Sequence, residues 1–304
     1  MPRISTFAAS QSAIMDLMNA QRSVFDAQKQ LATGKRADDL KGIGYRAEAL
    51  AAAYAARDRA EAYKEAATRT EARLEVQDVA LERISDALMK LRVDLTTANP
   101  DFIMDQATQT FDEIRSALGA RHAGAFVFAG TRSDTDPVAI TDITDLVPMA
   151  DASEAFQNSD RKAQVQLDQN IVHDAGPLAN DVATESFAIL KRIAEFDAGA
   201  QGPFGTPNNA AQTAAMQAEL QNIITAIDNM NDVIAENGAL QARVETENNS
   251  LGDRAVFLTR MIGDLEDIDM AEAATRFEQA RTAVDVSART FSTLSQVSLL
   301  PFLR

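Results

Sequence analysis

The chain offers few side chains whose types and spacing suit catalysis or metal binding. Its only two histidines, His122 and His173, are 51 residues apart and carry no flanking ligand pattern. We interpret both as surface or turn residues. There is no cysteine, which excludes disulfides, zinc–thiolate sites and thiol nucleophiles. The sequence therefore predicts no metal site.

Three other patterns could bind a phosphate, a calcium ion or a glycan. Gly34-Lys35 lacks the earlier glycine of a phosphate loop, and a helix end explains its lysine. Asp264, Asp267 and Asp269 resemble part of a calcium loop without its glycine and final glutamate, which favours a solvated linker. Asn248-Asn249-Ser250 matches a glycosylation sequon inside a helical pattern. With no Ser-His-Asp set or carboxylate dyad, we expect no enzyme and no cofactor.

Composition and charge indicate a helical protein with a strongly acidic middle. Aromatic residues make up 6% and tryptophan is absent, while Ala, Leu, Gln, Glu and Arg dominate. Of the net charge of −16, residues 1–36 carry +3 and residues 270–304 carry +1, which leaves −20 between them. An acidic body disfavours nucleic acid, and nearly neutral ends can pack closely.

Neither a membrane span nor a general secretory signal is predicted. No segment approaches the run of about 18 apolar residues that crosses a membrane, so we expect no membrane insertion. The first seven residues have no apolar core and no small-residue cleavage site.

The order of elements predicts a mainly α fold: a long antiparallel helical bundle or coiled coil, built from the N- and C-terminal halves, with a small β-rich insertion between them. Helices are expected over 4–32, 45–98, about 101–121, 181–198, 208–265 and 268–303. Gly34 is expected to end the first of these helices, and Asn99 to cap the start of the third. A heptad at Leu74, Gln77, Leu81, Ile84, Leu88, Leu91 and Leu95 predicts one buried face. Strands are expected at 125–130 and 163–167.

Both ends of the chain carry apolar residues at heptad spacing. In the C-terminal segment these are Met270, Ala273, Phe277, Ala280, Val284, Ser287, Phe291 and Leu294. In the N-terminal segment they are Ile4, Phe7, Gln11, Ile14, Met18, Gln21, Phe25 and Gln28. Two such seams indicate a chain that closes on itself or assembles with others.

Four short stretches, in a fixed order, carry a family resemblance. They are Leu-Ala-Thr-Gly-Lys-Arg at 31–36, Gly-Ala-Phe-Val-Phe-Ala-Gly-Thr at 124–131 with Pro137, Asn-Gly-Ala-Leu-Gln-Ala-Arg-Val-Glu at 237–245, and Leu-Glu-Asp-Ile-Asp-Met-Ala-Glu-Ala at 265–273 with Ser-Leu-Leu at 298–300. Together they resemble the bacterial flagellin family, and more closely its hook-filament junction branch, hook-associated protein 3. No single stretch is specific, but their order over nearly the whole chain is.

The resemblance implies an extracellular structural adaptor of the flagellum that joins hook-associated protein 1 to flagellin. It implies export through the flagellar apparatus without a cleaved signal peptide, and an export chaperone. Residues 1–36 and 268–304 would form an inner domain that is disordered in the monomer and folds on assembly; 37–130 and 177–267 would form a helical rod, and 131–176 the insertion. The expected assembly interface consists of Ile4, Phe7, Ile14, Met18, Phe25, Met270, Phe277, Val284, Phe291, Leu294, Leu299 and Leu300.

Several alternatives stay open at this point. A filament flagellin would share the same ends and export route, and an ordinary intramolecular helix bundle would also use the apolar seams. A long-helix enzyme of the lyase type would need a Gly-Ser-rich loop, which the sequence lacks. A surface coiled-coil protein could use the insertion at 131–176 to bind a polymer or host factor.

Overall fold

The computed structural model describes residues 2–97, 99–206 and 209–296; for residues 2–7 and 294–296 it describes the backbone only. Its residues form two compact units, one made of 1–59 with 254–304 and the other of 60–253. We call them the terminal unit and the central unit. Two helices, α3 (Ala47–Thr97) and α6 (Ala210–Glu266), contribute residues to both.

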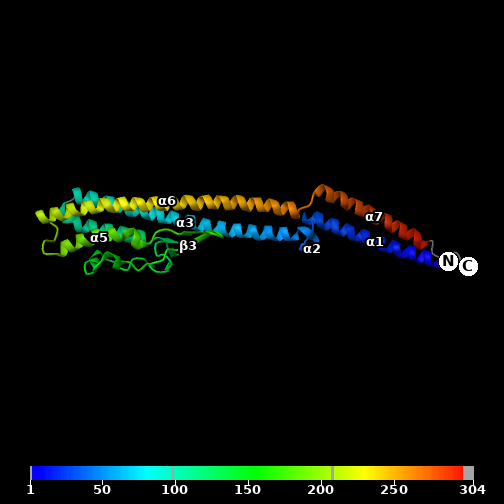
Figure 1. Ribbon diagram of the computed structural model, residues 1–304, viewed down its shortest axis with the longest axis horizontal. Coiled ribbons are helices and arrows are strands. Elements are labelled where there is room, and N and C mark those ends of the chain that lie inside the picture. The colour runs from blue at the N-terminus through cyan, green and yellow to red at the C-terminus, as the bar shows by residue number, and fades with distance from the viewer. Residues whose placement is uncertain (1, 98, 207–208, 297–304) are drawn as a thin grey trace. The chain divides into compact units, whose positions relative to one another are not determined.

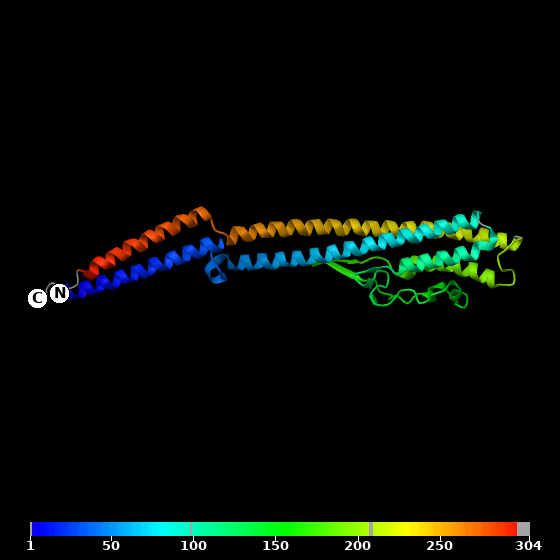
Figure 2. The same cartoon turned by 180° about the vertical axis from the view of Figure 1, so that it is seen from behind.

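The terminal unit is built around two paired helices. α1 (Pro2–Thr33) and α7 (Met270–Gln296) run side by side, as both views show (Figures 1 and 2). Between α1 and α3, the expected glycine linker holds a single turn, α2 (Leu40–Ile43), and a 3₁₀ turn, η1 (Gly44–Arg46). A small apolar cluster of Leu50, Ala53 and Ile262 joins the start of α3 to the end of α6.

The central unit packs α3 and α6 with two shorter helices, α4 (Ile103–Leu118) and α5 (Ala179–Ala198). The predicted α3 heptad is confirmed, because all seven of its side chains are buried. Phe111 and Phe187 lie at the centre of this core with their rings 5.3 Å apart. A helix as long as α3 is stable because such a face is covered along its length.

The turns fall where the sequence predicts them. Asn99 accepts a hydrogen bond from the amide of Asp101, and Pro100 opens the 3₁₀ turn η2 (Pro100–Phe102) before α4. At the end of α1, Gly34 has φ +71°, the left-handed conformation that glycine adopts without a Cβ clash. A break in helix is expected from 199 to 207, and the described residues 199–206 lie outside α5 and α6.

The β structure consists of two small antiparallel pairs. β1 (Arg121–His122) pairs with β2 (Ala125–Phe126), and β3 (Gln164–Asp168) pairs with β4 (Ile171–Asp174). The intervening chain forms two 3₁₀ turns, η3 (Ile143–Leu146) and η4 (Ala152–Ala155). The mainly α fold with a small β insertion is confirmed, although the strand expected at 125–130 has only two residues.

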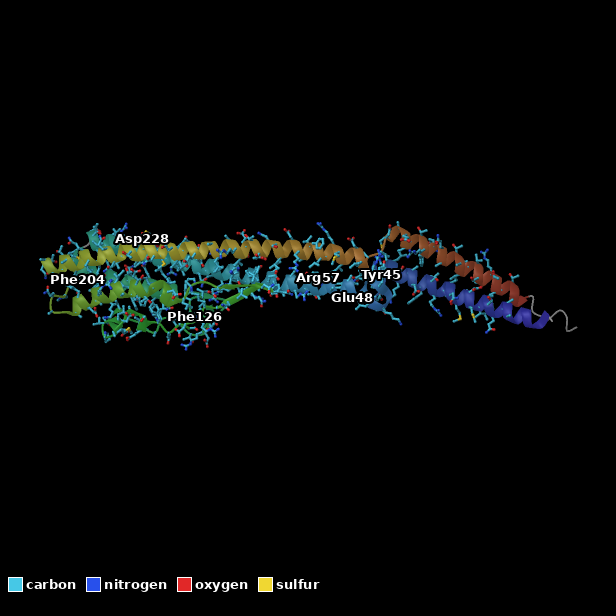
Figure 3. The ribbon with its side chains drawn as sticks, viewed as in Figure 1. Tyr45, Glu48, Arg57, Phe126, Phe204 and Asp228 are labelled. Carbon is cyan, nitrogen blue, oxygen red and sulfur yellow. The ribbon has the colours of Figure 1, made fainter. Side chains whose placement is uncertain are left out.

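Two aromatic side chains labelled in Figure 3 differ in their exposure to solvent. In the terminal unit, Tyr45 is 88% exposed. In the central unit, Phe204 is buried and stacks on Phe196 with the two ring centres 4.9 Å apart. Within the described part of the chain, no helix has the length and apolar character needed to cross a membrane.

Candidate assembly surface and terminal joint

The face of α7 that contacts α1 is the one predicted from its heptad. Ala273 is buried, and five further positions at 3-4 spacing are half-buried while their neighbours are exposed. These five are Phe277, Ala280, Val284, Ser287 and Phe291. Met270 is 54% exposed and lies at the edge of this face.

The face of α1 that contacts α7 is displaced by one residue from the predicted one. Ala13, Ala20 and Ala27 are buried, with 6–9% of their surface exposed. Between them Leu17 and Val24 are half-buried, so the contact seam also has 3-4 spacing. Alanines on both helices let the two backbones approach closely.

The predicted stripe of α1 therefore stays uncovered in the monomer. Ile14, Met18 and Phe25 are 42%, 53% and 64% exposed, and Met15 beside them is 56% exposed. We call Ile14, Met18 and Phe25 the outer stripe of α1. Both stripes have the same periodicity, so heptad spacing alone could not decide which of them contacts α7.

Some predicted interface residues lie outside what the structure describes. The side chains of Ile4, Phe7 and Leu294 are not described, nor are Leu299 and Leu300. Their part in an interface stays a prediction.

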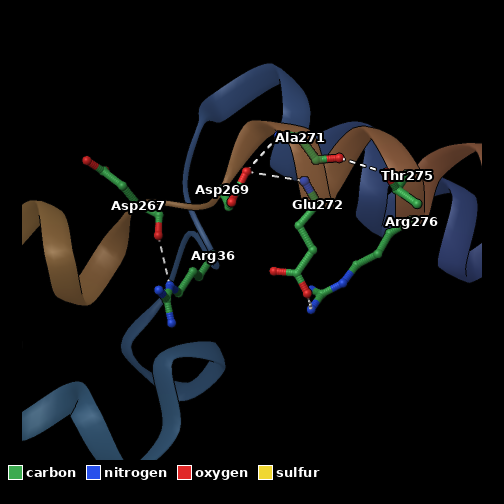
Figure 4. A network of polar contacts seen from close by, with 7 residues as sticks. All are labelled: Arg36, Asp267, Asp269, Ala271, Glu272, Thr275 and Arg276. Atoms are coloured by element: carbon green, nitrogen blue, oxygen red, sulfur yellow. Dashed lines mark hydrogen bonds and ion pairs between the residues drawn. The ribbon is translucent and has the colours of Figure 1, made fainter.

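The two motifs at the ends of the chain meet in a joint between the helices, which we call the terminal joint. Lys35 and Asp267 form an antiparallel bridge. The amide of Arg36 donates to the carbonyl of Glu266 at 2.8 Å, and the amide of Ile268 donates to the carbonyl of Gly34 at 3.0 Å. Arg36 Nε also donates to the carbonyl of Asp267 at 2.8 Å (Figure 4). Residues from the first and last motif thus hold each other in place.

Glu266 is the charged centre of this joint. Its side chain is 9% exposed and pairs with the Lys35 ammonium, while the Tyr54 hydroxyl donates to its other oxygen. Burial alone would raise the pKa of the Glu266 carboxyl, but the hydrogen bonds from Lys35 and Tyr54 outweigh it and leave that pKa lowered. The same bonds raise the pKa of Lys35 and of Tyr54. Lys35, interpreted from sequence as a helix-end cation, is therefore an ion-pair partner.

The acidic residues after α6 have structural roles. Asp269 accepts hydrogen bonds from the amides of Ala271 and Glu272 at 2.8 and 3.2 Å, which caps the start of α7 (Figure 4). Glu272 then pairs with Arg276 one turn later, at 2.5 Å. In the segment expected to be a solvated linker, Asp269 therefore caps α7 and the Asp267 backbone bonds to Arg36. Among the described residues, no group of three or more His, Asp or Glu could hold a metal ion.

The two inner motifs make contacts within the central unit. The Val127 carbonyl accepts hydrogen bonds from Arg73 at 2.7 Å and from Gln77 at 2.8 Å. The Leu74 carbonyl accepts from Asn237 at 3.3 Å and from Gln241 at 3.1 Å. The sequence placed Gln77 on the buried face but gave no signal for these hydrogen bonds, because their partners are distant along the chain.

A comparison with protein families matches residues 220–303 to a model described as the bacterial flagellin C-terminal helical region. The chain thus carries a flagellin-type C-terminal region. This region includes most of α6 and the whole of α7, and so the C-terminal side of the terminal joint, residues 266–268. No curated protein matches the sequence.

Solved structures share the fold at low sequence identity. A putative flagellar hook-associated protein from Vibrio parahaemolyticus is 17% identical with a TM-score of 0.59, covering 75% of this chain and 98% of its own. FlgL of Xanthomonas campestris is 14% identical with a TM-score of 0.53, over 68% and 99% of the two chains. FlgL of Bacillus cereus is 12% identical with a TM-score of 0.50, over 64% and 97%. The matched region and this fold support a structural role in the bacterial flagellum.

Proposed function

We propose that this chain is a non-enzymatic adaptor at the hook-filament junction of a bacterial flagellum. In this role it would join hook-associated protein 1 to the flagellin filament, outside the cell. The flagellin-type region at 220–303 and the resemblance to FlgL structures support the proposal. Export through the flagellar apparatus, aided by a chaperone, is part of the same proposal.

The outer stripe of α1 is the observation that carries an assembly role. Large apolar side chains such as Phe25 and Met18 remain more than half exposed, on a helix whose other apolar face is already covered by α7. Contiguous exposed apolar surface on a helix marks a place where another chain packs. Neighbouring subunits are the proposed partners, since the near-neutral charge of 1–36 and 270–304 lets these ends crowd together.

Coupled folding and assembly fits the composition of the α1–α7 contact. The α1 side of this contact is buried chiefly through alanines, which remove little apolar area from water. Ordering a helix costs about 1–2 kcal/mol of backbone entropy per residue, so an isolated pair gains little net stability. Packing on the outer stripe in an assembly would supply the missing burial. Residues 1–36 and 268–304 are accordingly proposed as the inner domain.

Immunogold electron microscopy of intact flagella tests this function, with an antibody raised against residues 60–253. A single band of label between hook and filament is the expected result. Label along the whole filament would instead make the chain a filament flagellin, which the match at 220–303 also favours. The absence of flagellar label would overturn both roles.

A further inference from the structure

One cavity in the central unit is lined by basic and small apolar residues. It has a volume of about 370 Å³ and lies between α3, the β1–β2 turn and β3. Its basic residues are Arg69, Arg73 and His122. Among the described residues that line it, none is acidic. This is unusual for a chain whose net charge is −16.

Arg73 is the residue that makes this cavity a candidate site. Its guanidinium donates one hydrogen bond, from Nη2 to the Val127 carbonyl at 2.7 Å, and its Nε is buried with no hydrogen-bond partner. In the described part of the chain it forms no ion pair with a carboxylate. Burial lowers the pKa of Arg73 below its ordinary value, but a guanidinium stays protonated in proteins. Its half-buried charge is therefore partly desolvated and is met by a carbonyl dipole and not by an opposite charge, which is less favourable than an ion pair.

The surroundings of Arg73 define what could compensate that charge. Arg69 lies one helical turn earlier on the same face of α3 and pairs with Glu65 at 2.7 Å, with both side chains well exposed. The remaining walls include the apolar residues Ala66, Val165 and Ala175. Cavities of about 300–1,000 Å³ with mostly apolar walls and a few polar groups are typical of small-ligand sites.

We propose that this cavity binds one carboxylate of a small organic acid such as glutarate, or of an acidic side chain of similar reach. The carboxylate accepts charge-assisted hydrogen bonds from Arg73, and its short apolar stem lies against the alanine and valine walls. The carboxylate has two possible sources, a free small molecule or an acidic side chain of a second copy of this chain. The proposal does not depend on the flagellar role.

Titration calorimetry with glutarate tests the site, using the full chain at a dilution where it is monomeric and at constant ionic strength. Glutaramide, which has the same stem without charge, is the probe control. The wild-type protein should show saturable binding of glutarate and no binding of glutaramide. Arg73→Gln should weaken binding by tenfold or more, whereas Arg83→Gln, an exposed arginine on the same helix outside the cavity, should leave it unchanged.

Two results would overturn the site: no saturable binding of glutarate, or equal binding by wild type and the Arg73 variant. If Arg73→Gln does not fold, Arg69→Gln replaces it, because Arg69 is exposed; unchanged binding in that variant would also count against the site. Sedimentation at high concentration then separates the sources. Self-association that glutarate weakens assigns the carboxylate to a second copy, and self-association that glutarate leaves unaltered assigns it to a free ligand.

Discussion

The amide of Ile268 donates a hydrogen bond of 3.0 Å to the carbonyl of Gly34, so the end of α1 and the start of the α7 segment are held together through their backbones. Gly34 can present its carbonyl in this way because its φ is +71°. Around this bond, Glu266 pairs with Lys35 and Tyr54. The terminal joint is therefore a defined structure with measurable stability.

Removing the charge of Glu266 should loosen the terminal joint. Glu266→Gln keeps the shape of the side chain but replaces an ion pair by neutral hydrogen bonds, at a cost of about 1–2 kcal/mol in local stability. Hydrogen exchange at the Ile268 and Arg36 amides should accelerate by about tenfold, since 1.4 kcal/mol corresponds to a factor of ten. Glu278→Gln, at an exposed position of α7, is the matched control and should leave both rates unaltered.

The same joint should weaken in acid. The pKa of the Glu266 carboxyl is lowered from 4.5, so its contribution is complete above that value and is lost as the pH falls through the lowered pKa. The pKa of Lys35 is raised from 10.5, so its contribution persists below that value and is lost as the pH rises through the raised pKa. Exchange at the Ile268 amide, corrected for its intrinsic rate, should show the acid loss in wild type. Equal acid loss in Glu266→Gln would contradict this assignment.

Enlarging a seam alanine should separate α1 from α7. Ala20 is 9% exposed and faces α7, so Ala20→Leu overpacks the contact, a change that typically costs about 1–3 kcal/mol. In the assembled protein, where the inner domain is proposed to be folded, limited proteolysis should then cut α7 faster than in wild type. Ala9→Leu adds the same side chain at an exposed position of α1 and should leave the rate unchanged. Equal protection in the two variants would show that the alanine seam does not hold the helices.

A charge in the outer stripe should block assembly and spare the monomer. Phe25→Asp places a carboxylate on a side chain that is 64% exposed, so the helix content of the monomer by circular dichroism should be unchanged. Incorporation into flagella, measured by the immunogold label, should be lost because a charge cannot be buried unpaired. Asn19→Asp adds the same charge outside the stripe and should still incorporate. Phe291→Asp should block incorporation and also weaken the contact of α7 with α1.

A glycine in the second motif should be irreplaceable for steric reasons. Gly130 has φ +65°, and a Cβ there would lie 2.5 Å from the Arg161 carbonyl oxygen. Gly124 has φ +85° with no atom within 4 Å of such a Cβ, so Gly124→Ala carries only the backbone strain, about 1–2 kcal/mol. Thermal unfolding should show a clearly larger loss for Gly130→Ala. Similar losses of thermal stability in the two variants would mean that the loop around Arg161 shifts to make room for the added Cβ.

Sequence reasoning predicted what depends on local chemistry and periodicity. The structure confirms three such predictions: the Asn99 cap, the left-handed conformation of Gly34 and the buried heptad of α3. Each of them depends on residues that are close together in the sequence. The stripe of α1 that the sequence singled out is not the one that contacts α7, because Ala20 and Met18 belong to stripes of identical spacing; its place in an assembly interface stays a prediction. Only the partner helix decides between them, and that choice is not encoded locally.

Polar contacts between residues far apart in the chain could not be predicted from the sequence for a similar reason. Arg73 carries no motif of its own, and its bond to Val127 depends on how the β1–β2 turn meets α3. In the sequence Glu266 is only one residue of the fourth motif, and its pairing with Lys35 and Tyr54 cannot be read from that motif. A charged residue's role depends on which distant residue neutralises it.

The make-up of the two units also bears on biosynthesis. The central unit is one uninterrupted stretch, 60–253, so all of its packing partners have been translated before residue 254 is added. The terminal unit draws on 1–59 and 254–304, so α1 emerges from the ribosome long before α7 exists. Domains fold as units during synthesis, and the central unit is therefore positioned to fold first. For most of the time that the ribosome works on this chain, α1 has no intramolecular partner.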